Sequence, residues 1–557
     1  MKKVKFSLFL AAIGCCALGL AGCKVKGVDS KDYVNVLFPT IDGIVFVTDD
    51  LNGNGAIEKG SELQFTIDLT QWSGPKNSDL NLLVNGNEIE CNDSGVYSLI
   101  ASQDLTFSFA DVTITFNEAE GVEYLSEYGA TATVPFNSEL SFKLDISPYY
   151  TADSAIVRAG TRVADPNSDG TYVIRANSDM EINVLDVVRM QSTCTSGGTS
   201  NEDPFMIYTP ADWLFIAEQV NAGNVNYVNG YYQLEADLDF KGETIPVIGD
   251  ATEVSEGVNT YFGGYFNGMG HTISNFKIQE SDMPFVGLFG YVVDATIENL
   301  TIEGLVAEVE GGTLAAVAGR ADGKCVFKNI TVKNCKLGTY NNRCGAIVGW
   351  TGYYKNEADE TVCDFTFEDI NICDDVVLGG LWGSFDSSIG GVMGQLNSGA
   401  TNCLLKNVTV SCRIDAYNDC TASYDYYLYR MCGMLIGQMT KTTQIDGSTY
   451  PDVAAYGIEF ENVTVNYGQW MNYHYCEPTP GLNGGRGMRV EAGFTYDGLP
   501  SDFDHTQCVD NHYNCIPFDQ LFGGTQTACK GVKAWDGVTV NYPAKYTCSL
   551  CGNEHGE

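Results

Sequence analysis

Short runs in which apolar and polar residues alternate fill the first third of the chain after its apolar N-terminus. Residues 61–69 show the pattern clearly, and residues 138–146 repeat it. Successive side chains of a strand point to opposite faces, so each run predicts a strand with one buried face. Gly, Asn and Asp residues separate the runs, as the turns between short strands require.

These runs belong to two copies of one unit, which we place at residues 33–118 and 119–191. Two further matches keep the same order in both copies: 95–97 with 170–172, and 104–109 with 179–184. Short strands between frequent turns predict two immunoglobulin-like β-sandwich modules. We expect these modules to act as spacers.

Residues 192–202 are small and polar and indicate a linker before a different pattern begins at 203. Thr209 is a suitable N-cap, Pro210 suits the first helical position, and Gly223 can end the helix. The apolar face of this predicted helix comprises Trp213, Ala217 and Val220.

Between about residues 260 and 470, a column pattern recurs six times around an Asn or Asp. Positions −2, +1 and +3 from the central residue are apolar each time, and the alternation slips by one across it, which indicates a corner. We expect the Asn side chains to bond in a ladder, with Asp369 as a weak point because it lacks the amide donor. The central residues are Asn275, Asn299, Asn329, Asp369, Asn407 and Asn462.

A second column consists of four-residue stretches that end in glycine. We interpret each as a short strand whose final Gly permits a tight or positive-φ turn. Two strands and two corners per repeat predict a β-solenoid over 203–470, with coils stacked about 4.8 Å apart. The stretches are 287–290, 316–319, 346–349, 391–394 and 434–437.

Residues 262–275, together with 287–290 and 297–300, resemble the repeats of bacterial surface proteins with GLUG motifs. The resemblance covers about 203–305 and continues as columns alone to about 470. It implies a right-handed parallel β-helix whose motif carries no catalytic residues. Asn267 stands where the family usually has Asp. Some members are IgA-cleaving metallopeptidases with an added protease domain, but this sequence contains no His-Glu-x-x-His.

The N-terminus has the order of a secretion signal. Three lysines precede an apolar run at 6–20, which ends in Leu20, Ala21, Gly22 and Cys23. These four residues resemble the lipobox of bacterial lipoproteins, which implies a signal peptide at 1–22, a lipid on Cys23 and a tether at 23–32. Lys24 after the cysteine favours the outer membrane by the same resemblance. The alternative is an ordinary signal peptide with a chance cysteine. We expect a cell-surface outer-membrane lipoprotein that is attached to the membrane by its lipid.

Composition limits the function classes. The 557 residues include 31 Lys and Arg against 71 Asp and Glu, a net charge of −40, which would repel a phosphate backbone. We therefore expect no nucleic-acid partner. A hydrophobic content of 44% is enough for folded cores, which excludes a wholly disordered chain.

The chain has 20 cysteines, and 17 remain after the signal peptide and the lipid-bearing Cys23 are set aside. An odd number leaves at least one thiol unpaired or intermolecular. Two pairs share a solenoid column with one coil between their members, which puts them about 9.6 Å apart and beyond disulfide reach. We expect these to be small buried residues: Cys325 with Cys403, and Cys344 with Cys432.

Residues 471–557 form a Cys/His-rich C-terminal region. Its spacings suit disulfides, a structural zinc site or free thiols, and these alternatives stay open. A catalytic zinc is not expected, because no general base stands beside the His-x-x-Cys pairs at 505–508 and 512–515. The candidate ligands are His505, Cys508, His512, Cys515, Cys548 and Cys551.

A candidate calcium loop lies in the first module. Asp50, Asn52 and Asn54 supply oxygens at alternate positions before Gly55, but Ser61 stands where an EF-hand needs glutamate. A plain Asn/Gly turn is the alternative. Beyond these structural zinc and calcium candidates we assign no cofactor.

Aromatic residues in the longer insertions of the solenoid are the candidate binding residues, because exposed rings stack on sugars or anchor proteins. They are Trp350, Tyr353, Tyr354, Trp382, Tyr424, Tyr426, Tyr427 and Tyr429. We expect an adhesin-like, non-catalytic protein that binds a glycan or a surface protein. A polysaccharide lyase or glycoside hydrolase is one alternative, with Asp374, Asp375 and Asp386 as the only acid cluster near Trp382, and a structural stalk is the other.

Overall fold

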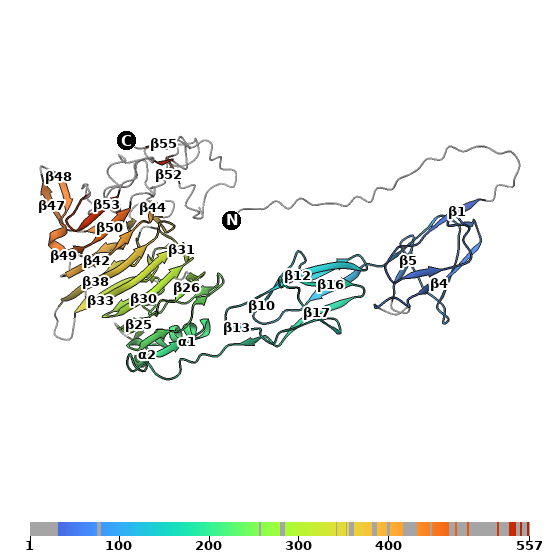
Figure 1. Ribbon diagram of the computed structural model, residues 1–557, viewed down its shortest axis with the longest axis horizontal. Coiled ribbons are helices and arrows are strands. Elements are labelled where there is room, and N and C mark those ends of the chain that lie inside the picture. The colour runs from blue at the N-terminus through green and yellow to red at the C-terminus, as the bar shows by residue number, and fades with distance from the viewer. Residues whose placement is uncertain are drawn as a thin grey trace. The chain divides into compact units, whose positions relative to one another are not determined.

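The structure is a computed structural model, and the residues it describes are mostly strand (Figure 1). They divide into two compact units: unit 1 comprises Met1–Ala119, Tyr124–Leu144 and Ile156–Leu185, and unit 2 comprises the rest. Among these residues, no helix is both long and apolar enough to span a bilayer. The described residues are 32–74, 80–255, 258–278, 284–340, 342–352, 354–355, 361–380, 387–397, 402–415, 432–439, 441–445, 448–466, 474–475, 487–488, 521–522, 534–541, 546–547 and 554–555.

The first pair of sheets in unit 1 encloses a core of its own, with Leu63, Phe65 and Phe107 inside. Most pairs are antiparallel, but β1 and β8 run parallel. One sheet has the order β3 (Ala56–Glu58), β1 (Tyr33–Leu37), β8 (Leu105–Phe109), β5 (Leu82–Val84), β6 (Asn87–Ile89), and the other β2 (Val45–Val47), β4 (Glu62–Asp68), β7 (Val96–Ile100).

A second pair of sheets follows along the chain and repeats this mixture, with β9 and β17 parallel. One sheet has the order β11 (Thr131–Val134), β9 (Val112–Phe116), β17 (Met180–Leu185), β14 (Ile156–Ala159), β15 (Arg162–Ala164). The other is β10 (Val122–Leu125), β12 (Ser138–Ile146), β16 (Tyr172–Ala176), and β13 (Tyr150–Thr151) pairs with β18 (Val188–Arg189).

The segments matched in sequence occupy equivalent places in the two pairs of sheets. Phe65 on β4 stacks on Tyr97 of β7, with ring centroids 5.0 Å apart and planes at 7°. Phe142 on β12 stacks on Tyr172 of β16 at 5.3 Å and 12°. One aromatic pair therefore recurs at the same strand pairing.

A carboxylate recurs in the same way. Asp104 accepts a bond from the backbone N–H of Asn35 at 2.7 Å, and Asp179 accepts one from the N–H of Thr113 at 2.7 Å. Each aspartate stands directly before its strand, β8 or β17, and each donor lies on the strand that pairs in parallel with it. Internal duplication of one unit explains both coincidences.

Unit 2 contains the predicted helix, α1 (Pro210–Asn221), which is followed by the short α2 (Val225–Val228). Thr209 and Asp212 form a capping box, and the predicted face of Trp213, Ala217 and Val220 is buried. The Asp212 carboxylate also accepts from the backbone N–H of Thr193 at 2.6 Å. The segment that we interpreted as a linker is thereby held against α1 at this end.

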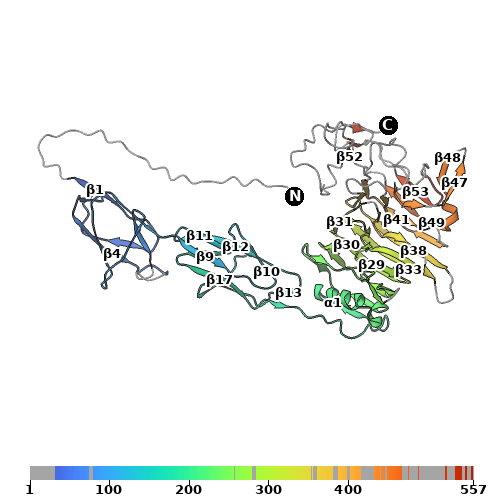
Figure 2. The same ribbon diagram turned by 180° about the vertical axis from the view of Figure 1, so that it is seen from behind.

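Parallel strands then succeed one another along unit 2, as Figures 1 and 2 show from opposite sides. The largest sheet is parallel except where β37 meets β38. Its order is β19 (Phe205–Ile207), β20 (Tyr231–Leu234), β21 (Leu238–Asp239), β25 (Tyr265–Asn267), β26 (Thr272–Ser274), β29 (Phe289–Val293), β30 (Thr296–Glu303), β33 (Ala318–Lys333), β36 (Val348–Thr351), β37 (Tyr354–Lys355), β38 (Thr361–Ile372), β41 (Met393–Leu396), β42 (Asn402–Lys406), β43 (Thr409–Val410), β46 (Ile436–Met439), β49 (Ile458–Glu461), β50 (Val463–Asn466) and β53 (Val538–Asn541).

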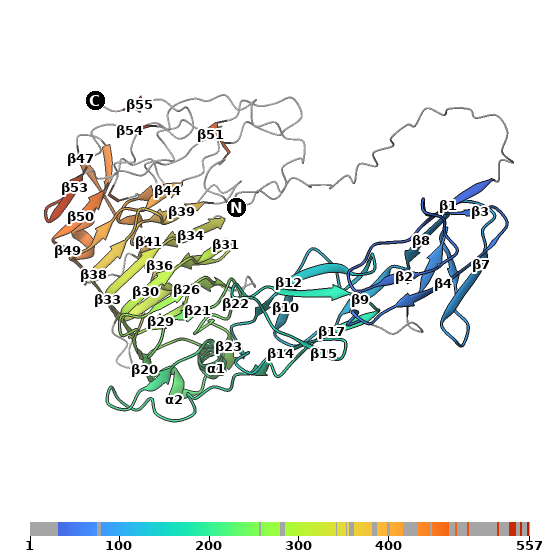
Figure 3. The same cartoon turned by 45° about the vertical axis from the view of Figure 1, so that its right-hand side comes forward.

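Two further all-parallel sheets accompany it, and Figure 3 shows the second of them beside the largest sheet. They are β28 (Phe285–Val286), β32 (Thr313–Ala315), β35 (Arg343–Gly345), β40 (Ser388–Gly390), β45 (Cys432–Gly433), and β31 (Val306–Glu310), β34 (Lys336–Tyr340), β39 (Val377–Gly380), β44 (Arg413–Asp415). The remaining pairs are β22 (Thr244–Ile245) with β27 (Lys277–Ile278), β23 (Glu253–Ser255) with β24 (Val258–Asn259), β47 (Thr442–Ile445) with β48 (Ser448–Pro451), β51 (His474–Tyr475) with β52 (Gly487–Met488), and β54 (Tyr546–Thr547) with β55 (Glu554–His555); a 3₁₀ turn spans Val453–Tyr456.

The structure confirms the predicted columns of inward-facing apolar residues from Ile297 to Phe460. The residue at position −2 of each coil pairs with its counterpart in the next, in the series Ile297, Phe327, Phe367, Leu405 and Phe460. The first four are fully buried in one continuous apolar core, and the partly buried Phe460 packs against that core. Coils that repeat the same strands in register are the arrangement expected of a parallel β-helix.

The corner ladder is also present. Its central residues take left-handed φ values between +49° and +57°, which Asn and Asp tolerate best. The Nδ2 atom of each Asn donates to the Oδ1 atom of the coil before, at 2.8 Å from Asn329 to Asn299 and at 2.9 Å from Asn462 to Asn407. Within the described coils, no hydrogen bond joins Asn329 to Asp369, so the ladder breaks where we expected.

The assignment of Asn275 to this column was wrong. Its neighbour Ser274 pairs with Glu303, so Asn275 stacks over Gly304 at a second corner. The reason is that this corner has the same apolar spacing, with Ile302 at −2 and Leu305 at +1. The pattern alone could not separate the two corners.

The interpretation of the glycine column needs a different correction. Gly290, Gly319, Gly349, Gly394 and Gly437 stack in register as expected, but each is the second residue of a strand and none has a positive φ. Space is the physical reason for glycine here. A Cβ on Gly394 would lie 2.5 Å from the carbonyl oxygen of Gly349 and 2.7 Å from the nitrogen of Cys344.

The cysteine columns follow the prediction. Phe365 pairs with both Cys325 and Cys403, and Ile389 pairs with both Cys344 and Cys432, so one coil separates each cysteine pair. All four side chains are buried in the apolar core. They pack as small apolar residues.

Candidate functional site

Trp350 lies on strand β36 and therefore on a sheet, although we expected it in an insertion. It pairs with Arg320 of β33 and with Gln395 of β41. One residue per coil continues this line, and we call the set the Trp350 column. Its members are Tyr291, Arg320, Trp350, Gln395 and Gln438. Figure 3 shows β33, β36 and β41 stacked in this order.

A second line of residues faces the Trp350 column across the glycines. Only two residues join β28 to β29, so the chain turns sharply and the two sheets adjoin. Ser388 donates to Gln438 at 2.9 Å, and Arg343 bonds to Gln395. In both cases the contact reaches from one coil to the next, which ties neighbouring coils together.

Two guanidinium groups lie over the Trp350 ring. The Cζ atom of Arg320 is 4.5 Å from the ring centroid, and that of Arg343 is 4.7 Å away. Such cation–π contacts contribute about 0.5–2 kcal/mol each, more as water is excluded. The indole therefore holds two cations at fixed positions on a rigid sheet.

Only one of these cations has an acidic partner among the described residues. Arg320 forms two bonds to Asp322, at 3.0 and 2.7 Å, and Tyr291 donates its hydroxyl to the same carboxylate at 2.8 Å. Arg343 bonds to the neutral amides of Gln395 and Asn342. Burial, and then the charge of Arg320, lower the pKa of the Arg343 guanidinium.

The indole N–H of Trp350 is buried and finds no acceptor in the described part of the chain. A buried donor without a partner costs about 1–3 kcal/mol.

The local charge is two cations, Arg320 and Arg343, against one carboxylate, Asp322, in a chain with a net charge of −40. We take this cluster of Arg320, Trp350 and Arg343 as the candidate site.

Sequence reasoning found Trp350 but missed both arginines. A signal was present, because each member of the Trp350 column directly follows a column glycine: Gly290, Gly319, Gly349, Gly394 and Gly437. No comparable sequence pattern indicated Arg343, because it lies on β35, which belongs to another sheet.

Most other candidate residues lie outside the described residues: Cys23, Tyr353, Trp382, Tyr424, Tyr426, Tyr427, Tyr429, His505, Cys508, His512, Cys515, Cys548 and Cys551. Tyr354 is placed in β37, where its backbone pairs with Val362. Among the described residues, no group of three or more His, Cys, Asp or Glu side chains could hold a metal ion. The candidate binding and metal assignments at the undescribed positions remain predictions.

In the candidate calcium loop, the side-chain oxygens accept backbone bonds. Asp50 accepts from the N–H of Gln64 at 2.7 Å, and Asn52 accepts from the N–H groups of Asn54 and Ala56, both at 3.0 Å. The bond from Asn54 to Asn52 is that of an Asx turn, and the bond from Gln64 joins Asp50 to β4. Calcium binding at this loop remains a prediction.

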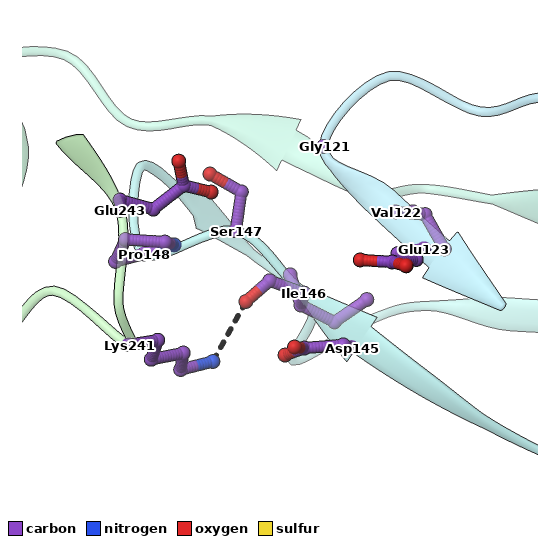
Figure 4. Close-up of a pocket in the computed structure, with 9 residues that line it drawn as sticks. All are labelled: Gly121, Val122, Glu123, Asp145, Ile146, Ser147, Pro148, Lys241 and Glu243. Atoms are coloured by element: carbon purple, nitrogen blue, oxygen red, sulfur yellow. Dashed lines mark hydrogen bonds between the residues drawn. The ribbon is translucent and has the colours of Figure 1, made fainter. Parts of the chain in front are cut away.

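A hollow of about 220 Å³ in unit 2 offers a contrasting environment (Figure 4). Its lining carries the carboxylates of Glu123, Asp145 and Glu243, and its one cation, Lys241, donates to the carbonyl oxygen of Ile146 at 2.7 Å. None of its nine lining residues is aromatic. Acidic side chains alone do not define a site, so we assign it no role.

A larger hollow of about 630 Å³ in unit 1 includes Trp72, but its cations already have partners. Arg175 pairs with Glu139 at 2.6 Å, and Arg162 donates to the carbonyl oxygen of Ser73. Trp72 itself packs on Phe136, with centroids 5.9 Å apart. These contacts give Arg175, Arg162 and Trp72 structural roles, so we assign this hollow no binding function.

The acid cluster of the enzyme alternative is only partly described. Asp374 and Asp375 are exposed in the turn that precedes β39, and Asp386 lies outside the described residues. No opposed pair of carboxylates comes from the two that are placed. A typical glycosidase needs a pair of carboxyl groups that flank the scissile glycosidic bond, one on each side.

Comparison with known proteins shows distant similarity to two large proteins. The chain is 28% identical over 329 residues to Halomucin of Haloquadratum walsbyi, which covers 54% of this chain and 3% of that protein. It is 29% identical over 143 residues to a Putative Gly-rich membrane protein of Evansella cellulosilytica, which covers 26% of this chain and 16% of that protein. The chain thus matches only a small part of either relative.

No family model matches the chain, and no solved structure matches it. The class that the findings define is a mostly-β protein with small mixed N-terminal sheets and long parallel sheets, distantly similar to Halomucin.

Proposed function

We propose that the chain is a cell-envelope protein that binds a glycan, without catalysis, at the cluster of Arg320, Trp350 and Arg343. The proposal includes the finer assignments made from sequence: lipid attachment at Cys23 in the outer membrane, immunoglobulin-like modules as spacers, and a right-handed GLUG-type β-helix. One relative is named Halomucin and the other is named a membrane protein, and both names support a location in the cell envelope.

The observation that carries the proposal is the pair of guanidinium groups held over one partly exposed indole. Guanidinium and amide donors fixed on a sheet suit the hydroxyl and acidic groups of a sugar. The amides of Gln395 and Gln438 extend the same line over two further coils. A line of donors along the stack fits an extended chain of sugars.

A protein ligand has less support. Specific protein interfaces centre on buried apolar and aromatic anchors. Within the described part of unit 2, the large apolar side chains exposed are scattered over separate elements: Val188, Tyr208, Val225, Met269 and Val306. No apolar patch emerges from these residues.

The test is binding of the full chain to an array of neutral and acidic oligosaccharides. We expect binding that Arg343→Gln abolishes. Lys324→Gln is the matched control, because it removes the same charge from β33 four residues beyond Arg320. Absence of binding to every glycan, or equal loss in both variants, would reject the proposed site. Release of shortened sugars during the assay would instead favour the enzyme alternative.

A further inference from the structure

We propose that the sugar bound at this cluster is acidic, and that its carboxylate or sulfate oxygens occupy the place of a missing acid beside Arg343. This inference rests on the proposed function and names the class of its ligand. It follows from a comparison of neighbouring coils.

The first step is the comparison of Arg320 with Arg343. In the coil of Arg320, the acid two residues further along the strand, Asp322, neutralises the guanidinium. The next coil carries Trp350 in the column, and the residue two positions further is Gly352. That coil has a cation but no acid at the matching position.

The second step is the space at Gly352. A Cβ at this glycine would lie 2.1 Å from Oδ1 of Asp322 and 2.8 Å from Nη2 of Arg320. A side chain at this position would have to displace the carboxylate of Asp322 and the guanidinium of Arg320 from each other, so the strand as it stands supplies no second acid there. An acid for Arg343 must come from elsewhere.

The third step is the set of donors left over. Arg343 uses Nε on Gln395 and Nη1 on Asn342, while its Nη2 has no acceptor among the described residues. A carboxylate or a sulfate accepts several N–H bonds at once, and the guanidinium fork matches both groups.

The fourth step is the electrostatic balance. Two cations close together and partly shielded from water repel each other, and an anion removes that repulsion. The remainder of the chain is strongly acidic, with a net charge of −40. A long polyanion would be repelled, so we expect a short acidic sugar to bind better than a densely charged polymer.

The experiment compares three probes with the full chain by calorimetry: trigalacturonate, its methyl ester and galactose 6-sulfate. The ester keeps the shape of the sugar and removes its charge. We expect the ester to bind at least about tenfold more weakly than the acid, since a charge-assisted bond is roughly twice as strong as a neutral one. Preference for the sulfate over both the ester and the acid would support the anionic site and identify sulfate as the group.

The variants separate binding from folding. Arg343→Gln should remove the difference between acid and ester, while Arg343→Lys should keep part of it because the charge remains. Thermal melting of each variant shows whether it folds. Equal affinity of acid and ester would overturn the acidic-ligand inference and leave the glycan proposal standing. Failure of all three probes overturns the inference, and failure of the whole glycan array overturns the proposed function.

Discussion

The Nδ2 atom of Asn407 donates to Oδ1 of Asp369 at 2.9 Å, but Asp369 has no donor to pass on to Asn329 in the coil before it. Replacing the carboxylate with an amide supplies that donor. Because φ at residue 369 is +55°, where Asn is tolerated, the substitution adds no backbone strain.

We therefore expect Asp369→Asn to raise the free energy of unfolding by about 0.5–1.5 kcal/mol, the usual net contribution of one hydrogen bond. Denaturant titration measures it. The converse change, Asn407→Asp, removes a donor from an intact part of the ladder and should lower stability. A loss of stability in Asp369→Asn would show that the ladder does not hold the coils.

The inward columns could be predicted from sequence because every coil repeats the same apolar positions. Asn275 was misplaced because its corner has the same offsets as the other corner. The candidate site was only partly predictable, because it forms across coils: Arg343 meets Gln395 at a separation of 52 residues. No local pattern marks such a contact.

A ladder of alternating charge crosses the stack beside the Asn ladder. Glu368 contacts Lys328 at 2.9 Å and Lys406 at 3.2 Å. Hydrogen bonds from these two lysines lower the pKa of the Glu368 carboxyl. The stability from a carboxyl with a lowered pKa is present above its unfolded pKa and is lost as the pH falls through its folded pKa.

Glu368→Gln should therefore lower stability at pH 7 and reduce its dependence on pH in the acid range. The effect should shrink in high salt, because these side chains are partly exposed. Glu459→Gln on β49 is the control, because Glu459 is exposed and makes none of these ladder contacts. A salt-independent effect would contradict the electrostatic explanation. Denaturation curves at several pH values and salt concentrations decide the matter.

Asp212 is fully buried at the start of α1 and accepts bonds from segments on both sides of the helix end. Its partners include the N–H groups of Thr193 at 2.6 Å and Thr209 at 2.9 Å. Burial by itself raises the pKa of the carboxyl, but these bonds outweigh it, and the pKa is lowered.

Asp212→Ala should destabilise unit 2 by about 3 kcal/mol, since it leaves several buried donors without an acceptor. Glu218→Ala, at an exposed position of the same helix, should change stability by less than about 0.5 kcal/mol. In the parent chain the contribution of Asp212 is lost as the pH falls through its folded pKa. Equal melting temperatures for the two variants would refute this role of the cap.

The buried thiols should be inert while the protein is folded. Burial raises the pKa of Cys325 to about 12, and Cys403 shifts in the same direction. A thiol with a raised pKa contributes stability that is complete below its unfolded pKa and is lost as the pH rises towards the folded value.

Iodoacetamide at pH 8 should therefore modify Cys325 only when denaturant is present, which mass spectrometry of peptides shows. Between pH 7 and pH 10 the parent chain should lose more stability than Cys325→Ala. Rapid labelling of Cys325 under native conditions would mean that the core opens far more readily than its packing indicates.

The glycine column offers the sharpest test of the stack. A Cβ at residue 394 would meet backbone atoms of Gly349 and Cys344, on the strand before it and on the adjoining sheet, within 2.5 to 2.7 Å. Backbone atoms cannot rotate away as a flexible side chain can, so Gly394→Ala must push coils apart. We expect a loss of at least about 3 kcal/mol in the free energy of unfolding. Gly129→Ala is the matched control, because nothing lies within 4 Å of its added Cβ and its φ is not positive. If Gly394→Ala melted at the parent temperature, the adjoining sheets could not lie as close as described, and the contact between Arg343 and the Trp350 column would fail with them.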